Sequence, residues 1–126
     1  MKLNLLKKPR TFKVGEKKIP IKDFGKIVLN NDEMVSFKFS KNNNYDFTKK
    51  NWGFYISQSI MQRMKLNNFT IYLVKNKISS RFYLLAKQVD QEKEFKKYLI
   101  KEKIKIIFKF SKKNLIKIEE TFKINT

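Results

Sequence analysis

Several segments of this chain alternate apolar and polar residues with a period of two, which is the pattern of a β-strand with one buried face. The clearest example is Met34 to Phe39, where Val35, Phe37 and Phe39 alternate with mostly polar neighbours. The chain also has one alanine, three glycines and two prolines in 126 residues, so the small residues that allow close helix contacts are scarce. The sequence therefore predicts a fold rich in antiparallel strands.

Turn-forming residues divide the N-terminal half into short predicted strands. Gly15 and Glu16 separate the first two strands, Gly25 opens the third, and Asn30 to Asp32 precede the fourth. The asparagine-rich segment Ser40 to Tyr45 predicts a loop. The predicted strands of this meander are Thr11 to Val14, Ile19 to Ile21, Lys26 to Leu29 and Met34 to Phe39.

A helix is predicted after Trp52, because Ser59 and Gln62 fit a capping box and the apolar residues that follow Ser59 share one helical face. Farther along, Phe69 to Val74 and Arg81 to Lys87 both alternate and predict a central hairpin, with a turn between them. The apolar residues of the predicted helix face are Ile60, Met61 and Met64.

A second helix is predicted over Gln91 to Lys103, with Asp90 as its N-cap. Glu92 and Lys96 have the spacing of an ion pair on this helix. Ile104 to Phe110 alternates again and predicts a strand with one apolar face.

The last segment, residues 115–124, fits two patterns. Leu115, Ile118 and Phe122 have helical spacing, whereas Ile116, Ile118, Phe122 and Ile124 fit a strand. A turn at Ser111 to Asn114 and the strand-rich composition favour a terminal hairpin. The sum is an α+β fold of one domain, residues 1–126, with a largely antiparallel sheet of about six to eight short strands and about two helices.

The chain carries 30 Lys and Arg against 11 Asp and Glu, a formal charge of +19. Such a surface attracts anionic partners. Lys, Asn, Ile and Phe make up more than half of the residues, and AT-rich codons encode all four, so drift in an AT-rich genome is the alternative explanation. AT-rich codons also encode Glu readily, yet Glu occurs only seven times. Codon drift therefore explains the large number of lysines better than it explains the excess of basic over acidic residues.

The chain contains no histidine and no cysteine, which removes the usual general base, the thiol nucleophile and the soft metal ligands. The three glycines lie too far apart for a phosphate-binding loop. We therefore expect no cofactor and no metal site, and the sequence favours a noncatalytic protein. A ribonuclease that uses Lys, Arg and Tyr stays chemically conceivable, because RNA supplies its own 2′-OH nucleophile.

Residues Met1 to Arg10 contain an apolar stretch far shorter than that of a signal peptide, and no later segment has the length of a membrane span. The absence of cysteine agrees with a reducing compartment. These features predict a cytoplasmic protein without a membrane span.

The segment from Asn51 to Arg63 concentrates the single tryptophan, one glycine and one arginine. An aromatic ring beside a glycine, followed by a helix N-terminus, can form a site for an anionic ligand, and an arginine one turn later can donate two hydrogen bonds to it. In the alternative interpretation the aromatic residues belong to the core and the serines only cap a helix. The candidate ligand-binding residues are Trp52, Gly53, Tyr55, Ser57, Ser59 and Arg63.

A second candidate is the predicted central hairpin. Arg81, Tyr83 and Lys87 share one face of a strand, and Tyr72 lies on the adjoining strand. Tyrosines that stack on bases beside cations that neutralise phosphates have the chemistry of a surface for single-stranded nucleic acid. An ordinary solvated sheet face is the alternative interpretation.

Three functions follow from these patterns. The leading hypothesis is a basic noncatalytic module that binds RNA or single-stranded DNA through Tyr72, Arg81, Tyr83 and Lys87. The second is an accessory protein that binds an anionic metabolite or an acidic protein partner near Trp52 to Arg63, for example in polysaccharide biosynthesis. The third is a structural subunit whose exposed aromatic residues pair with another chain. The oligomeric state is left open.

Overall fold

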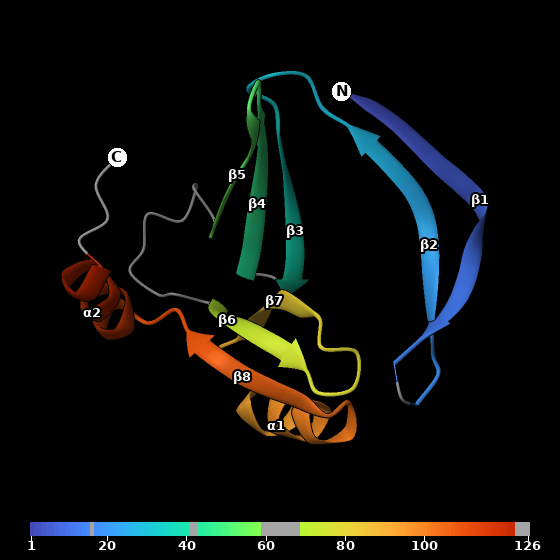
Figure 1. Ribbon diagram of the computed structural model, residues 1–126. Coiled ribbons are helices and arrows are strands. Elements are labelled where there is room, and N and C mark those ends of the chain that lie inside the picture. Colours follow the sequence, from blue (N-terminus) through green and yellow to red (C-terminus); the bar gives the residue numbers. More distant parts are fainter. Residues whose placement is uncertain (16, 41–42, 59–68, 123–126) are drawn as a thin grey trace. The chain divides into compact units, whose positions relative to one another are not determined.

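The computed structural model in Figure 1 describes residues 1–15, 17–40, 43–58 and 69–122. Within these ranges the chain forms eight strands in three antiparallel sheets and two helices, which confirms the predicted α+β class. Contacts divide the chain into two compact units, Met1–Asn68 and Phe69–Thr126, which we call the N-terminal unit and the C-terminal unit. That the two units form one domain stays a prediction.

The first sheet is a hairpin of β1 (Lys2–Val14) and β2 (Ile19–Val28). Both strands are longer than predicted, and β1 contains Pro9. The pairing shifts in register between Leu5 and Arg10, and Pro9 lies in this irregular stretch. A proline cannot donate a ladder hydrogen bond, so the register shift is what lets one long strand include it.

Gly25 explains why β2 continues where a new strand was predicted to begin. It pairs with Leu5 at a φ of 122°, and a Cβ at this position would lie 2.1 Å from the backbone oxygen of Asn4. Glycine alone permits this close approach of two backbones. The glycine that suggested a strand boundary is therefore a contact point inside the hairpin.

The second sheet consists of β3 (Met34–Ser40), β4 (Asn43–Lys50) and β5 (Gly53–Gln58), in that order. Figure 1 shows them side by side, with β4 in the middle. The predicted loop Ser40 to Tyr45 is therefore wrong from Asn43 onward. Asparagine has a low strand propensity, but β4 pairs with a strand on each side, and this pairing overrides the propensity.

Residues after Trp52 form β5 rather than the start of a helix. Phe54 and Ile56 alternate with Tyr55 and Ser57, which is the period of a strand. The predicted capping box at Ser59 and Gln62, with Ile60, Met61 and Met64, lies outside the described residues.

The alternation gives the second sheet an apolar face and a more polar face. Strand register places residues opposite one another across β3, β4 and β5. On the polar face Ser36, Asp46 and Ser57 form one row. On the apolar face, which we call face P, lie Val35, Phe37, Tyr45, Phe47, Phe54 and Ile56.

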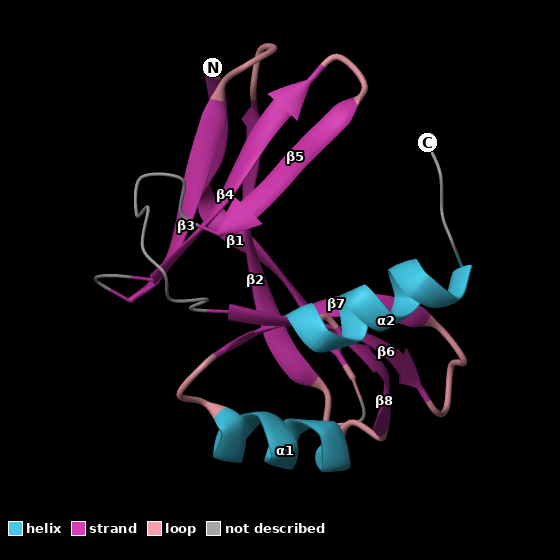
Figure 2. Ribbon diagram, turned by 90° about the vertical axis from the view of Figure 1, so that its left-hand side faces the viewer, coloured by secondary structure: helices cyan, strands magenta, loops and turns pink. Residues whose placement is uncertain are grey.

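The C-terminal unit contains the third sheet, with strands β6 (Phe69–Asn76), β7 (Phe82–Gln88) and β8 (Ile104–Lys109) in the order β7-β6-β8. The β6–β7 pair confirms the predicted central hairpin. Helix α1 (Glu92–Lys101) connects β7 to β8, and Figures 1 and 2 show it along one face of this sheet.

The core of the C-terminal unit lies between α1 and the sheet. Tyr72, Val74 and Ile104 are buried, and Phe95 and Leu99 of α1 pack against them. The rings of Tyr72 and Phe95 lie 5.0 Å apart between centroids. Half-buried Tyr83 and Leu85 of β7 complete the same cluster.

The second predicted helix is confirmed, but its start is not. Gln91, not Asp90, occupies the N-cap, and its side chain makes no capping hydrogen bond. The backbone N–H of Gln91 donates to the carbonyl of Gln88, so a turn ends at Gln91 before the helix begins. The predicted Glu92–Lys96 ion pair is present at 3.9 Å.

The terminal hairpin is wrong, because Lys112–Phe122 forms helix α2. The Ser111 hydroxyl accepts a hydrogen bond from the backbone N–H of Asn114, which is the geometry of an N-cap. The Asn114 amide also donates to the carbonyl of Lys109 and holds the helix start close to the end of β8. The residues interpreted as a turn are thus the start of a helix, and the helical spacing of Leu115, Ile118 and Phe122 was the correct pattern.

Replacement of Ile104 by alanine tests the C-terminal core. Ile104 is 5% exposed, so Ile104→Ala is expected to lower the free energy of unfolding by about 2 to 5 kcal/mol. Ile100→Ala is the matched control, since Ile100 on α1 is 78% exposed and its loss is expected to cost less than about 0.5 kcal/mol. Urea titration followed by circular dichroism measures both, and equal effects would contradict the assigned core.

Candidate functional site

The four residues proposed from the sequence as a nucleic-acid surface do not share an open sheet face. Register places Tyr72, Tyr83 and Lys87 on the face that α1 covers. Tyr72 is 5% exposed and Lys87 is 9% exposed. Tyr72 and Lys87 are therefore not on an accessible face and Tyr83 is half-buried, because the apolar residues Val74 and Leu85 on the same side pack with α1.

Lys87 is held in place by the residues around it. Its ammonium group is hydrogen-bonded to the Glu92 carboxylate and lies 5.7 Å from the Tyr72 ring centroid and 5.9 Å from that of Phe95. Burial disfavours the charged form, but the hydrogen bond to Glu92 and the proximity of Tyr72 outweigh it and raise the pKa of Lys87. The hydrogen bond from Lys87 lowers the pKa of Glu92, against a smaller opposing effect of burial. Lys87 thus fastens the start of α1 to the sheet.

Arg81 remains exposed. It ends the turn between β6 and β7, where its carbonyl accepts the backbone N–H of Asn76 and its N–H donates to the Ser79 hydroxyl. The Asn76 side chain accepts the N–H groups of Ile78 and Ser79 and shapes this turn. Of the four predicted residues, Arg81 is the one whose charged group stands clear of the α1 interface.

The opposite face of the same sheet, which we call the open face, combines aromatic and basic side chains. Lys75 on β6 pairs with Phe82 on one side and with Lys105 on the other. The Lys75 ammonium lies 5.2 Å from the Phe82 ring centroid. Among the described strand residues of this face no side chain is acidic. The open face comprises Ile71, Leu73, Lys75, Phe82, Leu84, Lys105 and Phe108.

Sequence reasoning missed the open face because it placed the apolar core on the wrong side of β7. Phe82 is 59% exposed and Leu84 is 61% exposed, although both are apolar. Phe108 contacts Phe110 edge-on at 5.2 Å, so its ring lies beside a second aromatic ring. The available signal was the partner strand, since Tyr72 and Val74 share one face of β6 while Lys75 lies on the other.

The second predicted site is partly assembled. Gly53, Tyr55 and Ser57 alternate along β5 and therefore share a face, and Trp52 occupies the turn that precedes them. Trp52 is 70% exposed and Tyr55 is 52% exposed. Ser57 belongs to a strand, not to a helix N-terminus as predicted. Ser59 and Arg63 lie outside the described residues.

A buried carboxylate lies beside this second site. Asp46 lies in the central strand β4 at 1% exposure and accepts a hydrogen bond of 2.7 Å from the Ser36 hydroxyl. Register places Ser57 directly across from it on β5. A negative charge at this point disfavours an anionic ligand that contacts Ser57. An anionic metabolite at this site stays a prediction without support from the described geometry.

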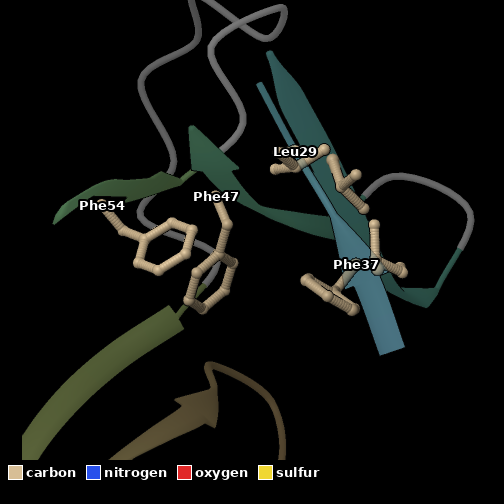
Figure 3. A pocket seen from close by; sticks show the side chains of 6 residues that line it. Leu29, Phe37, Phe47 and Phe54 are labelled. Atoms are coloured by element: carbon tan, nitrogen blue, oxygen red, sulfur yellow. The ribbon is translucent and has the colours of Figure 1, made fainter. Parts of the chain in front are cut away.

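The described residues of the N-terminal unit line, among others, a cavity on face P and a cavity in the hairpin. One has a volume of about 230 Å³ and is lined entirely by apolar side chains of face P and the end of the hairpin, as Figure 3 shows. The other, of about 380 Å³, lies at the register shift of β1 and contains the 2.9 Å ion pair between Arg10 and Asp23. The backbone N–H of Gly25 and the Arg10 guanidinium lower the pKa of Asp23 against the effect of burial. This ion pair neutralises Arg10 in the second cavity.

The Lys87–Glu92 contact predicts how stability depends on pH. A carboxyl group whose pKa is lowered on folding contributes stability above its unfolded value, 4.5, and loses it as the pH falls through the lower folded value. Glu92→Gln is therefore expected to remove part of the loss of stability that acid causes in the parent protein. Urea midpoints at neutral and acid pH compare the proteins, and a Glu92→Gln protein that loses as much stability in acid as the parent would contradict this role.

Among the described residues no group of three His, Cys, Asp or Glu side chains gathers closely enough to hold a metal ion. The described helices also include none with the length and apolar character of a membrane span.

Comparison of the chain with protein-family models, with curated proteins and with solved structures found no match.

Proposed function

We propose that this chain is a noncatalytic binding protein whose partner is RNA or single-stranded DNA, held on the open face of the β7-β6-β8 sheet. The observation that carries the proposal is the row Phe82, Lys75 and Lys105, in which an exposed ring lies beside two strands that each present a cation. Bases stack on such rings and phosphates bind such cations. Arg81, immediately before β7, adds a third cation next to this row.

The proposal differs from the sequence hypothesis in its residues but not in its chemistry. Phe82 replaces Tyr72 and Tyr83 as the stacking group, because those tyrosines pack against α1. Lys75 and Lys105 replace Lys87, whose charge Glu92 already engages. Phenylalanine stacks as well as tyrosine does, since every base presents a π-face and no hydrogen bond is required.

The described acidic residues of the C-terminal sheet and α1 lie away from the open face. Glu92 and Glu94 are on α1 and form ion pairs with lysines of α1 or β7, and Glu102 is buried at the end of the same helix. The open face therefore keeps its positive charge, and a phosphate backbone is the polymer that complements both its charge and its rings.

The first test is anisotropy of a short labelled polyuridine and its DNA counterpart across salt concentrations. Phe82→Ala is expected to weaken binding roughly tenfold, because one stacked base contributes about 1 to 3 kcal/mol. Phe122→Ala is the matched control, since Phe122 on α2 is 67% exposed and lies outside the open face. Equal affinities of the Phe82→Ala protein and the parent would contradict stacking on this residue.

The lysines are tested through the salt dependence. The double variant Lys75→Gln, Lys105→Gln is expected to reduce the slope of log affinity against log salt by about 0.7 for each phosphate that these lysines neutralise in the parent. Lys93→Gln, on the exposed side of α1, is expected to leave the slope nearly unchanged. If the double variant and the parent had the same slope, the phosphates would not be bound by Lys75 and Lys105, and the proposal would be contradicted.

A further inference from the structure

Strand β5 lacks the protection that β3 and β8, two other described edge strands, carry. Exposed edges are normally guarded by charges, prolines or bulges, because their free backbone groups otherwise pair with another chain. Strand β3, at the opposite edge of the same sheet, has Lys38 and a register shift beside it. Strand β8 has two lysines and a register shift. Strand β5 contains no charged residue and no proline, and its pairing with β4 is regular.

Three consecutive side chains of β5 are large, uncharged and exposed. Phe54, Tyr55 and Ile56 are 55%, 52% and 51% exposed, on alternating faces of the sheet. In the described part of the N-terminal unit β4 is the one strand that pairs with β5. An uncharged edge strand with three exposed large side chains and one row of backbone groups that no described strand pairs has the properties of a strand-addition site.

An apolar cavity adjoins this edge on face P. Its walls are Ile27, Leu29, Val35, Phe37, Phe47 and Phe54, and Phe54 belongs to β5. Figure 3 shows the Phe54 and Phe47 rings on one side of the cavity and Leu29 and Phe37 on the other. Its volume, about 230 Å³, is below the range of roughly 300 to 1,000 Å³ typical of small-molecule sites. The cavity suits one apolar side chain of a partner.

The other face of β5 offers a cation. Gly53 lies opposite Lys50, and no described atom lies within 4 Å of the place where its Cβ would be. A carboxylate on an added strand can therefore reach the Lys50 ammonium across Gly53. Lys50 bonds Asp32 at 2.5 Å, in an exposed ion pair that a second carboxylate can share.

The net charge of the N-terminal unit favours an acidic partner. Each described acidic side chain there is already engaged: Asp23 by Arg10, Asp32 by Lys50, Glu33 by the N-terminal ammonium and Asp46 by Ser36. The lysines outnumber these acids, so the unit keeps a net positive charge. A second copy would bring the same charge to the edge and be repelled, whereas an acidic chain would be attracted.

We propose that β5 accepts an extended acidic peptide of another protein as a fourth strand of the β3–β4–β5 sheet. The peptide alternates apolar and polar residues, and one of the polar residues is acidic. Its apolar side chains extend face P, with one in the cavity beside Phe54, and its acidic side chain lies opposite Gly53 on the face of Lys50, at the end of β5 away from Ser57. This interaction surface lies in the N-terminal unit and is independent of the nucleic-acid surface proposed for the C-terminal unit.

The probe is a labelled peptide in which leucine alternates with polar residues, glutamate at the position near one end and serine at the others, titrated into the full chain. Binding is expected for this peptide and is expected to be lost for the same peptide with alternate backbone nitrogens methylated, which keeps every side chain but blocks the ladder. The counterpart with lysine in place of glutamate is also expected not to bind. Equal binding of the methylated peptide, or of the lysine peptide, would overturn the proposal.

Two matched variants locate the interaction. Ile56→Glu places a negative charge on the β5 edge and is expected to weaken peptide binding at least about tenfold. Phe39→Glu places the same charge on the β3 edge at a comparably exposed position, 59% against 51%, and is expected to change affinity less than about twofold. A parent-like affinity of the Ile56→Glu protein would overturn the assignment to β5.

Hydrogen exchange of the unsubstituted protein provides a test that needs no variant. The peptide is expected to slow amide exchange in residues 53–58 and not in 34–40. Protection that rises with protein concentration in the absence of peptide would instead identify a second copy as the occupant and overturn the proposal. Polyuridine is absent from all these titrations, so their outcome is separate from that of the nucleic-acid tests.

Discussion

The packing of α1 against Tyr72, Val74 and Ile104 decides which chemistry the C-terminal sheet can offer. These residues bury one face of the sheet, and the contact of Tyr72 with Phe95 aligns the helix on it. Lys87 and Glu92 add a polar link at the helix start. As a result the other face, with Phe82, Lys75 and Lys105, is the one that can meet a partner. The nucleic-acid surface proposed for this sheet therefore depends on which of its two faces α1 covers.

The sequence predicted the elements whose apolar residues keep one period. The β6–β7 hairpin, β8 and α1 were anticipated because strand alternation and helical spacing do not conflict in them. The errors lie where local signals compete with pairing. Gly25 and the asparagines before Tyr45 suggested turns, yet Gly25, Asn43 and Asn44 lie in strands, because partner strands hold the backbone there. The apolar residues from Leu115 to Phe122 fitted both the helical and the strand period. The N-cap formed by Ser111 stabilises the helix that the structure has there.

The candidate site was harder to anticipate than the fold. Alternation shows which residues share a face, but it does not show which face a helix covers. Tyr83 and Lys87 do lie on one side, as predicted, but Leu85 lies there too and joins the core. Asp46 shows the same limit, since a carboxylate between Tyr45 and Phe47 gives no sign in the sequence that it is buried and bonded to Ser36. Asp46 is buried because β4 lies between β3 and β5, and the sequence of β4 alone does not show that arrangement.

The strand order also bears on how the nascent chain acquires its structure. In the described part of the N-terminal unit every ladder joins strands consecutive in the sequence, so each can close a short loop as soon as its second strand has left the ribosome. Strand β6 is different, because its second partner, β8, is synthesised only after β7 and α1. Until Lys109 has emerged, β6 remains paired on one side only. During translation of α1 and β8 one edge of β6 is therefore available for pairing with a foreign strand.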